Sequence, residues 1–256
     1  MSEKQDNQLS RREFLSGSTV AAGLAVAPGV FLTLTAQAKP ADQAVSSENR
    51  WGMLIDSNKC ANGCTSCVSA CEQENGWGSA NPTENKSAPE QKAQWIRKVT
   101  LRDKETGHVQ SLPLMCQHCE HPPCVDVCPT GASFKRADGI VLVDKHICIG
   151  CRYCMMACPY KARSFIHEDL QDQLPHAPRG KGTVESCTLC VHRVDRDSDK
   201  AVPACAEACN SEGHKAMVFG DLKDPDSEIS RELKNYGGEQ IRADLGLNTG
   251  IRYRGI

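Results

Sequence analysis

The stretch C-I-G-C-R-Y-C-M-M-A-C-P, residues 148–159, places four cysteines in one short loop and ends on a proline. All sixteen cysteines of the 256-residue chain fall into four groups of four. The groups are Cys60, Cys64, Cys67 and Cys71; Cys116, Cys119, Cys124 and Cys128; Cys148, Cys151, Cys154 and Cys158; and Cys187, Cys190, Cys205 and Cys209. Cysteines that recur at short spacings are typical of metal sites, so this pattern guides the interpretation of the whole chain.

The third group has the spacing C-x2-C-x2-C-x3-C-P, which ligates iron–sulfur clusters in bacterial ferredoxins. In two-cluster ferredoxins the fourth cysteine of such a run ligates the other cluster, so two runs interlock. The other groups vary this spacing: the second has Pro122 and Pro123 in a four-residue gap, the first opens with a three-residue gap, and the fourth has a gap of fourteen residues. Sixteen thiolates predict four [4Fe-4S] clusters with four ligands each.

Two other uses of cysteine compete with clusters. Structural zinc also uses C-x2-C pairs, but typically as two pairs separated by a spacer. A disulfide framework is the usual interpretation of an even cysteine count in an exported chain. Four cysteines within one short loop that ends in Cys-Pro favour clusters over both alternatives.

The composition limits what else can hold the fold together. Hydrophobic residues make up 39% of the chain and aromatic residues only 5%. A large conventional apolar core is therefore not expected, and bound clusters can supply folding free energy instead. The formal net charge of -2 argues against nucleic acid as a partner.

Residues 1–38 have the features of a twin-arginine export signal. The segment S-R-R-E-F-L, residues 10–15, is followed by a mildly apolar stretch over 17–34 and by the small-x-small site Ala36-Gln37-Ala38. A membrane anchor and a disordered tail are the alternatives, but glycines and a proline weaken the stretch as a membrane span. The twin-arginine pathway moves proteins that have already folded with their cofactors. We therefore expect a periplasmic protein that associates peripherally with the cytoplasmic membrane.

The remaining chain is predicted to form an α+β domain. Residues 39–50 read as a linker, 51–220 as the four-cluster domain with an insertion and hairpin over 72–115, and 221–256 as an extended C-terminal tail. Short strands are expected at 51–56, 94–101, 108–115, 139–144, 164–166 and 216–219. The predicted fold is two interlocked bacterial-ferredoxin-like modules with loop and hairpin insertions, organised around the clusters.

Two stretches carry a resemblance to a known family: residues 116–132, with C-Q-H-C-E-H-P-P-C and C-P-T-G-A, and residues 148–160. In these, and over about 51–220, the chain resembles the four-cluster electron-transfer subunits of bacterial membrane redox complexes. That family includes iron–sulfur subunits of dimethyl sulfoxide, polysulfide and tetrathionate reductases and of formate-dependent nitrite reduction. Within that family, the chain looks most like the DsrO-type periplasmic subunit of the membrane complex associated with dissimilatory sulfite reduction. This likeness lies in the twin-arginine signal, in residues 94–97 and in residues 243–253.

The resemblance implies that the first group pairs with the fourth and the second with the third. The implied ligand sets are Cys60, Cys64, Cys67 and Cys209 for cluster 1; Cys71, Cys187, Cys190 and Cys205 for cluster 2; Cys116, Cys119, Cys124 and Cys158 for cluster 3; and Cys128, Cys148, Cys151 and Cys154 for cluster 4. The three-residue gap in the first group departs from the family's commoner two-residue gap.

The resemblance also implies a function and partners. The chain would relay electrons between a quinone-interacting integral membrane subunit and a further redox subunit, a cytochrome or a molybdopterin protein, in dissimilatory sulfur metabolism. The alternative is the iron–sulfur subunit of a molybdopterin oxidoreductase or of a nitrite-reduction complex. A redox sensor or a structural metalloprotein is a different class, but no effector segment supports it. The sequence offers no carboxylate pair, activated nucleophile or phosphate loop, so we expect an electron-transfer subunit with no substrate site of its own.

Other side chains near the motifs have two interpretations each. His118 and His121 lie between cysteines, but sixteen cysteines already fill the sites, so both histidines are expected to be ordinary polar side chains. Tyr153 and Tyr160 are expected to pack against a cluster. Basic side chains near the motifs either are solvated or partly neutralise the anionic clusters; they are Lys59, Lys135, Arg136, Arg152, Lys161, Arg163 and Arg193.

Overall fold

The computed structural model describes residues 25–27, 30–31, 45–78, 88, 91–171 and 173–256. The chain divides into two units, residues 1–38 and residues 39–256. In the first unit, the strands β1 (Ala25–Ala27) and β2 (Val30–Phe31) form an antiparallel pair. The twin-arginine segment and the expected cleavage site lie outside the described residues. No helix in the described part of the chain is both long and apolar enough to cross a membrane.

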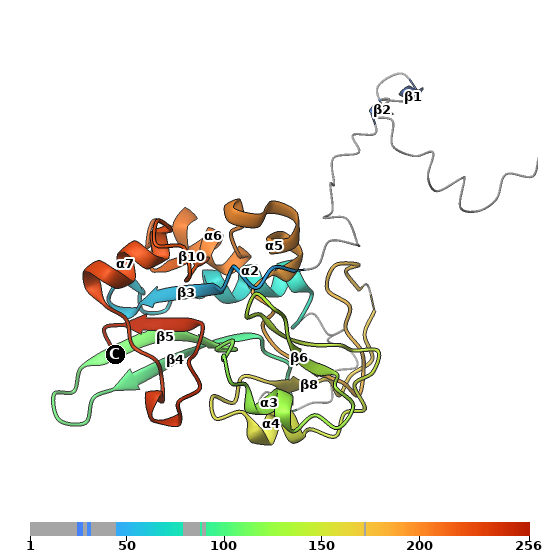
Figure 1. The fold of residues 1–256 in the computed structure, drawn as a ribbon, viewed down its shortest axis with the longest axis horizontal. Helices are drawn as coiled ribbons and strands as arrows, with labels where there is room; N and C mark the ends of the chain where they lie inside the picture. Colours follow the sequence, from blue (N-terminus) through green and yellow to red (C-terminus); the bar gives the residue numbers. More distant parts are fainter. Residues whose placement is uncertain (1–24, 28–29, 32–44, 79–87, 89–90, 172) are drawn as a thin grey trace, which may run out of the picture. The chain divides into compact units, whose positions relative to one another are not determined.

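A three-stranded sheet forms one side of the second unit (Figure 1). Its central strand is β3 (Trp51–Asp56), which pairs antiparallel with β10 (Met217–Asp221) and parallel with β11 (Ile251–Arg254). Every residue of β3 is buried, in agreement with the continuous apolar run W-G-M-L-I that predicted a strand here. Trp51 stacks on Phe219 of β10, with 5.4 Å between the ring centroids.

Three two-stranded antiparallel pairs complete the sheets. The pairs are β4 (Ile96–Arg102) with β5 (Val109–Met115), β6 (Ser133–Lys135) with β7 (Val141–Val143), and β8 (Ser164–Phe165) with β9 (Val184–Glu185). The hairpin expected within 94–115 is therefore present, with Ile96 opposite Met115. Part of the expected insertion, residues 79–87 and 89–90, lies outside the described residues.

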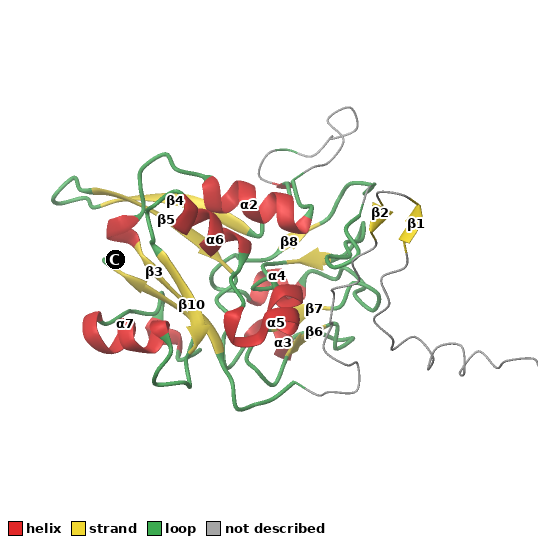
Figure 2. Cartoon of the chain, turned by 90° about the horizontal axis from the view of Figure 1, so that it is seen from above, coloured by secondary structure: helices red, strands yellow, loops and turns green. Residues whose placement is uncertain are grey.

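The helices are short, and most of them carry cysteines. They are α2 (Ser66–Asn75), α3 (Pro123–Asp126), α4 (Tyr153–Ala157), α5 (Val191–Asp197), α6 (Ala204–Ser211) and α7 (Glu228–Tyr236), with 3-10 turns η1 (Ser57–Lys59), η3 (Ser198–Lys200) and η4 (Ala243–Leu245). Helix α2 packs beside α6, and α3 packs beside α4 (Figure 2). Because α2 and α6 belong to the first and fourth cysteine groups, these two groups meet in space.

The segment 221–256 is more structured than the expected extended tail. Its helix α7 is capped by Ser227, whose hydroxyl accepts a hydrogen bond from the backbone N–H of Ser230 at 3.2 Å. Its strand β11 completes the sheet beside β3, where Ile251 and Tyr253 are fully buried. The Tyr253 hydroxyl accepts from Gln117 Nε2 at 3.1 Å and donates to the carbonyl of Pro113 at 3.2 Å. The segment is thus part of the same body as the cysteine loops.

The apolar core is built partly of cysteine side chains. One cluster of buried residues joins β3, the β4–β5 hairpin and the helices, and it contains Cys67, Cys71, Cys116, Cys158, Cys187, Cys205 and Cys209. All three tryptophans, Trp51, Trp77 and Trp95, belong to it. A smaller cluster contains Cys124 and Cys154 with Val141 and Val184. The cysteines thus occupy the positions that aliphatic side chains hold in an ordinary core.

Candidate functional site

The four cysteine loops share one turn, although their spacings differ. The residue before the second cysteine of each group has a left-handed backbone conformation: Gly63 (φ 77°), His118 (φ 43°), Gly150 (φ 69°) and Leu189 (φ 52°). A positive φ is uncommon for residues other than glycine, so its occurrence at His118 and Leu189 marks a constrained turn. The three-residue gap of the first group therefore still ends in the turn that the other loops use.

The cysteines predicted for cluster 1 lie together. Cys60, Cys64, Cys67 and Cys209 line one small cavity between α2, α6 and the β4–β5 hairpin. Burial raises the pKa of the Cys67 thiol to about 11; the Lys98 ammonium opposes this change, and Cys60, Cys209 and Cys64 raise the pKa further. These thiols come from the first and fourth groups, which are far apart in the sequence.

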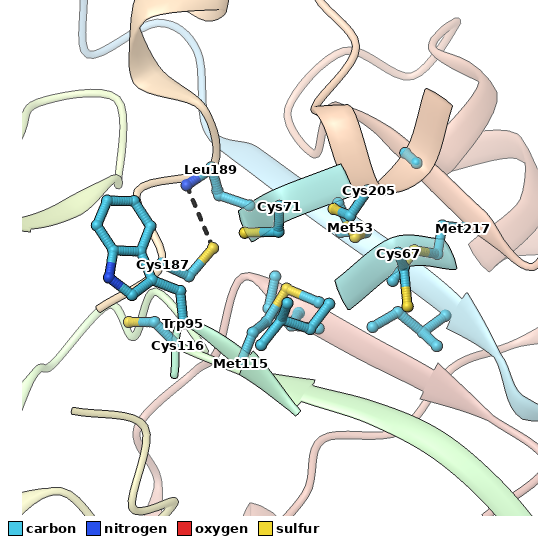
Figure 3. Close-up of a cluster of buried hydrophobic side chains, with 14 of the residues drawn as sticks. Met53, Cys67, Cys71, Trp95, Met115, Cys116, Cys187, Leu189, Cys205 and Met217 are labelled. Carbon is cyan, nitrogen blue, oxygen red and sulfur yellow. Dashed lines mark hydrogen bonds between the residues drawn. The ribbon is translucent and has the colours of Figure 1, made fainter. Parts of the chain in front are cut away.

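The cysteines predicted for cluster 2 lie deeper in the core. Figure 3 shows Cys71, Cys187 and Cys205 gathered among Met53, Met115 and Trp95. Burial raises the pKa of Cys71 to about 12, hydrogen bonding from Trp77 opposes it, and Cys190 raises it further. Burial also raises the pKa values of Cys187 and Cys205, and in both cases Cys71 and Cys190 add to the increase.

The cysteines predicted for cluster 3 interact across the second and third groups. Burial raises the pKa of Cys119 to about 12, and Cys116, Cys124 and Cys158 raise it further. Tyr160 lies near the same sulfur atoms: burial raises its pKa to about 12, and Cys119 and Cys158 contribute to the increase. Tyr160 therefore lies where the sequence led us to expect it, beside this group.

The cysteines predicted for cluster 4 are the most accessible. Burial raises the pKa of Cys154, Arg163 opposes this change, and Cys148 and Cys128 add to the increase. Cys128 and Cys148 are half-buried, and Cys151 is exposed, whereas the other cysteines are buried or half-buried. Tyr153, which the sequence predicted to pack against a cluster, is 55% exposed beside Cys151.

The four sets of cysteines also interact electrostatically with one another, in a fixed order. Cys67 of the first set contributes to the raised pKa of Cys71 and of Cys205 in the second, where burial is the main cause. Cys116 of the third set contributes in the same way to Cys187 of the second. Burial raises the pKa of Cys124, and Cys154 of the fourth set adds to it. The sets therefore form a continuous row.

Backbone N–H groups point at several cysteine sulfur atoms. The amide of Ala216 donates to Cys209 Sγ at 3.3 Å, Leu189 to Cys187 Sγ at 3.4 Å, Ser133 to Cys128 Sγ at 3.3 Å, and Val184 to Cys148 Sγ at 3.5 Å. The Leu189 bond is drawn in Figure 3. Such donors stabilise negative charge on sulfur, as expected around metal-bound thiolates.

Side chains outside the cysteine groups also donate to sulfur, among them Asn75 Nδ2, which lies 3.6 Å from Cys71 Sγ. Lys98 Nζ lies 2.8 Å from Cys60 Sγ, Trp77 Nε1 lies 3.2 Å from Cys71 Sγ, and Arg163 Nη2 lies 3.1 Å from Cys124 Sγ. The cysteine spacing points to neither Lys98 nor Trp77, and both were missed by reasoning from the sequence. Lys98 is 38 residues from its sulfur partner, so only the β4–β5 hairpin brings it there.

Most of the basic residues near the motifs form ion pairs with carboxylates and not hydrogen bonds with cysteine sulfur atoms. Lys59 pairs with Asp56 at 3.8 Å, Lys135 with Glu120 at 2.7 Å, Arg136 with Asp195 at 2.6 Å, and Arg193 with Glu74 at 2.7 Å. The Arg152 guanidinium lies over the ring of Phe165, 3.8 Å from its centroid. Of the expected basic set, Arg163 is the residue whose hydrogen bond to a cysteine sulfur is found among the described residues.

His118 is buried and neutral. Its Nδ1 accepts a hydrogen bond from the backbone N–H of Val141 at 3.0 Å, so the ring proton lies on Nε2. Burial lowers the pKa of His118 to about 3, with a smaller contribution from Arg163. The Nε2 atom is buried without a hydrogen-bond partner among the described residues. This unpaired donor lies in the loop between Cys116 and Cys119.

A second set of ligand-type side chains comes from α2, α5 and the loop between β8 and β9. Ligand atoms of Glu74, His176 and His192 lie within 4.8 Å of one another. Both carboxylate oxygens of Glu74 already accept hydrogen bonds from Arg193, at 2.7 Å each. A guanidinium bound to the carboxylate in this way repels a cation, so this set is better described as an ion-pair network than as a metal site.

The cysteines fit iron–sulfur clusters by their chemistry. All sixteen are free thiols, in four sets that backbone amides and unpaired buried donors surround. Burial raises the pKa values of most of the buried thiols, so these sulfur atoms need a bound cation to become thiolates at neutral pH. Iron supplies that charge, whereas an apolar core of free thiols would have no need for donors aimed at sulfur.

Comparisons with known proteins agree with this chemistry. Residues 107–222 match a 4Fe-4S dicluster domain family, and residues 59–132 match a second 4Fe-4S dicluster domain family. The Hdr-like menaquinol oxidoreductase iron-sulfur subunit 1 of Archaeoglobus fulgidus is 41% identical, over 96% of this chain and 97% of the relative. A sulfite dehydrogenase subunit of Allochromatium vinosum is 38% identical over 78% and 81%, and a tetrathionate reductase subunit of Salmonella typhimurium is 35% identical over 96% and 88%.

The chain belongs to the family of iron–sulfur electron-transfer subunits that carry 4Fe-4S dicluster domains. Two dicluster domains and sixteen cysteines fit four [4Fe-4S] clusters. The expected family resemblance and cofactor are thereby confirmed. The α+β class is also confirmed, with short helices and small sheets around the cysteine loops.

Proposed function

We propose that this chain is a periplasmic electron-transfer subunit that binds four [4Fe-4S] clusters through the ligand sets given above for clusters 1 to 4. In this proposal the first and fourth cysteine groups form one ferredoxin-like module, called the first module. The second and third groups form the other, called the second module. Each module interlocks its two groups, because each cluster takes three ligands from one group and one from the other.

The observation that carries the proposal is the continuous row of cysteine sets. Cys67 interacts with Cys71, Cys187 with Cys116, and Cys124 with Cys154, so each set adjoins the next. Bound clusters supply one-electron redox chemistry, and the order of the sets makes the row a relay from cluster 1 to cluster 4. A structural or sensing role would require one centre, not a row that spans the body.

The protein's own residues support this role in two ways. Buried apolar side chains such as Met53, Met115 and Trp95 exclude water from the middle of the row. Amide, indole, ammonium and guanidinium donors aimed at sulfur stabilise the negative charge that reduction adds.

The end of the row at cluster 4 is where we place electron exchange with a partner. Cys151 is exposed, and around it Ile149 and Met156 are each 67% exposed and Tyr153 is 55% exposed. Apolar side chains grouped around an exposed ligand favour a protein partner that buries them. The opposite end, at Cys60 and Cys64, is half-buried and carries Lys98.

We further propose that the partners are a quinone-interacting integral membrane subunit and a further redox subunit. Support comes from the Archaeoglobus relative, which is named as part of a menaquinol oxidoreductase, and from the Allochromatium relative, named as part of a sulfite dehydrogenase. The latter name favours dissimilatory sulfur metabolism. The R-R-E-F-L segment supports export to the periplasm by the twin-arginine pathway, with peripheral attachment to the membrane through the partner.

A second candidate is the iron–sulfur subunit of a molybdopterin oxidoreductase or of a nitrite-reduction complex. The name of the relative from Salmonella typhimurium, a tetrathionate reductase subunit, favours a reductase complex of this kind. The redox subunit that co-purifies with the chain from native membranes separates the two candidates. A cytochrome partner supports the first, and a molybdopterin partner the second.

The proposed cofactor content is tested on protein purified without oxygen. We expect about sixteen iron and sixteen acid-labile sulfide atoms per chain. Replacement of Cys67 by serine should lose or alter one cluster, and replacement of Cys209 should affect the same one, although the two residues lie in different groups. Stoichiometric zinc, or separate clusters affected by the two substitutions, would contradict the proposed ligand sets.

A further inference from the structure

Arg163 is a buried cation that forms no ion pair with any carboxylate of the described residues. It lies between the third cysteine group and β8, and it is 5% exposed. The ion pairs between described residues engage Arg136, Arg179 and Arg193, but none includes Arg163. Isolated charge is unfavourable in a protein interior unless a counter-charge lies nearby. The counter-charge for this guanidinium must therefore come from the sulfur atoms around it.

The guanidinium faces two different sets of cysteines. Its Nη2 donates to Cys124 Sγ, a proposed ligand of cluster 3, at 3.1 Å. Cys154, a proposed ligand of cluster 4, belongs to the same small cluster of buried residues as Cys124, so the guanidinium lies where the two sets meet. Cys116, on the cluster 3 side, interacts with it as well. The planar guanidinium group of Arg163 therefore lies next to the cysteines proposed for clusters 3 and 4.

Two nitrogen atoms of this guanidinium have no hydrogen-bond partner among the described residues. They are the Nε and Nη1 atoms of Arg163, and both are buried. Buried N–H donors are almost always paired, so two unpaired ones on a single cation point to acceptors that the polypeptide does not provide. Sulfide and thiolate sulfur atoms of the neighbouring clusters are acceptors of the right charge.

Lys98 and Lys145 show that this arrangement is particular to Arg163. Lys98 contacts Cys60 at the opposite end of the row. Lys145 is near Cys148, but its Nζ donates to the carbonyl of Val184 at 2.7 Å, on the cluster 4 side. Among these three cations, only Arg163 interacts with proposed ligands of two clusters.

We propose that Arg163 is a positioning residue shared by clusters 3 and 4. Its charge raises the reduction potentials of both clusters and keeps the two potentials similar. The inference rests on the proposed ligand sets. Reduction of either cluster adds one electron and therefore one negative charge beside the same guanidinium. Arginine stays protonated at all physiological pH values, so it stabilises that charge without giving up a proton. An electron that moves from one side of Arg163 to the other remains next to the same cation.

The test is a redox titration of the full-length, cluster-loaded chain, followed by electron paramagnetic resonance. In Arg163→Gln, two of the four couples should become about tenfold harder to reduce, which is about 59 mV for a one-electron couple. The other two couples should not move. Arg163→Lys keeps the charge but loses the planar guanidinium group, so the same two couples should shift by less. Lys98→Gln serves as the matched control and should shift a third couple instead.

Each outcome decides the inference. If Arg163→Gln loads four clusters and shifts none or only one couple, Arg163 does not serve two clusters. If the Arg163→Gln chain does not bind four clusters, the same titration is made on Arg163→Lys, and a shift of none or only one couple again contradicts the inference. Loss of clusters 3 and 4 in both variants would assign Arg163 to assembly and overturn the proposal. Failure of the proposed function is distinguishable, because the wild-type chain would then lack four clusters before any substitution is made.

Discussion

The two modules hold similar cysteine loops in different surroundings. In the first module, the cysteines proposed for cluster 2 belong to the buried core with β3 and the hairpin. Its side-chain donors include the neutral Trp77 indole at Cys71 and the Lys98 ammonium at Cys60. In the second module a buried guanidinium donates to Cys124, which packs in one buried cluster with Cys154, and one proposed ligand, Cys151, is exposed. The shared left-handed turn sets the loop geometry in both. Charge and exposure are therefore set by residues outside the cysteine groups.

The largest effect on stability is expected from Gly150→Ala, which changes the left-handed turn of a cysteine loop in the second module. A Cβ atom at this position would lie 2.1 Å from the carbonyl oxygen of Gly182, and φ is +69°. Backbone displacement and left-handed strain together should cost about 3 kcal/mol or more. The measurement is the urea concentration at which cluster absorbance is lost.

Gly182→Ala is the matched control for that substitution. Its φ is +80°, but no atom lies within 4 Å of the added Cβ, so only backbone strain of about 1–2 kcal/mol is expected. Equal stability of the two variants would show that the close approach of the two loops does not hold the second module together.

The next effect concerns the cation of the first module. Lys98→Gln removes a charged donor from Cys60 Sγ and should lower the potential of one cluster by the equivalent of about 1.5 kcal/mol. Lys59→Gln is the control, because Lys59 is next to Cys60 in sequence but pairs with Asp56 at 3.8 Å. Redox titration of both variants checks this prediction, and an equal shift in the two would indicate a general charge effect.

A smaller effect is expected when the neutral donor is removed. Trp77→Phe keeps the buried ring but loses the N–H that donates to Cys71 Sγ at 3.2 Å. The potential of one cluster should fall by the equivalent of about 1 kcal/mol, less than in Lys98→Gln. A shift as large as that of Lys98→Gln would mean that neutral donors tune the first module as strongly as charge does.

The smallest effect on stability is expected at the exposed end of the second module. Ile149→Glu should change stability by no more than about 0.5 kcal/mol, because Ile149 is 67% exposed. It should nevertheless slow electron transfer to the co-purified partner complex. Leu101→Glu in the β4–β5 hairpin, 49% exposed, is the control and should leave the rate unchanged. Equal electron-transfer rates in wild type and Ile149→Glu would show that the partner does not dock at Ile149.

The cysteine groups, the strand at 51–56 and the hairpin within 94–115 were predictable, because each depends on a local pattern of spacing or alternation. Lys98 and Trp77 were not, since their positions beside sulfur follow from packing between segments. Arg163 was one of seven basic residues near the motifs, and no local rule separates it from Arg193, which pairs with Glu74. In the C-terminal segment, charge and glycine content led us to predict a tail, and we overlooked the alternation I-R-Y-R at 251–254, where the structure has the strand β11.

The pairing of β11 with β3 has a consequence for the order of events during synthesis. Asp56 and Arg254 form an ion pair although they are 198 residues apart in the chain. The ribosome delivers the middle strand of the sheet long before the neighbour that covers it. The cysteine loops of the first module therefore have one edge of their supporting sheet open until residues 251–254 are synthesised. Completion of this sheet is therefore a late event in synthesis, because Arg254 of the closing strand lies 198 residues beyond Asp56.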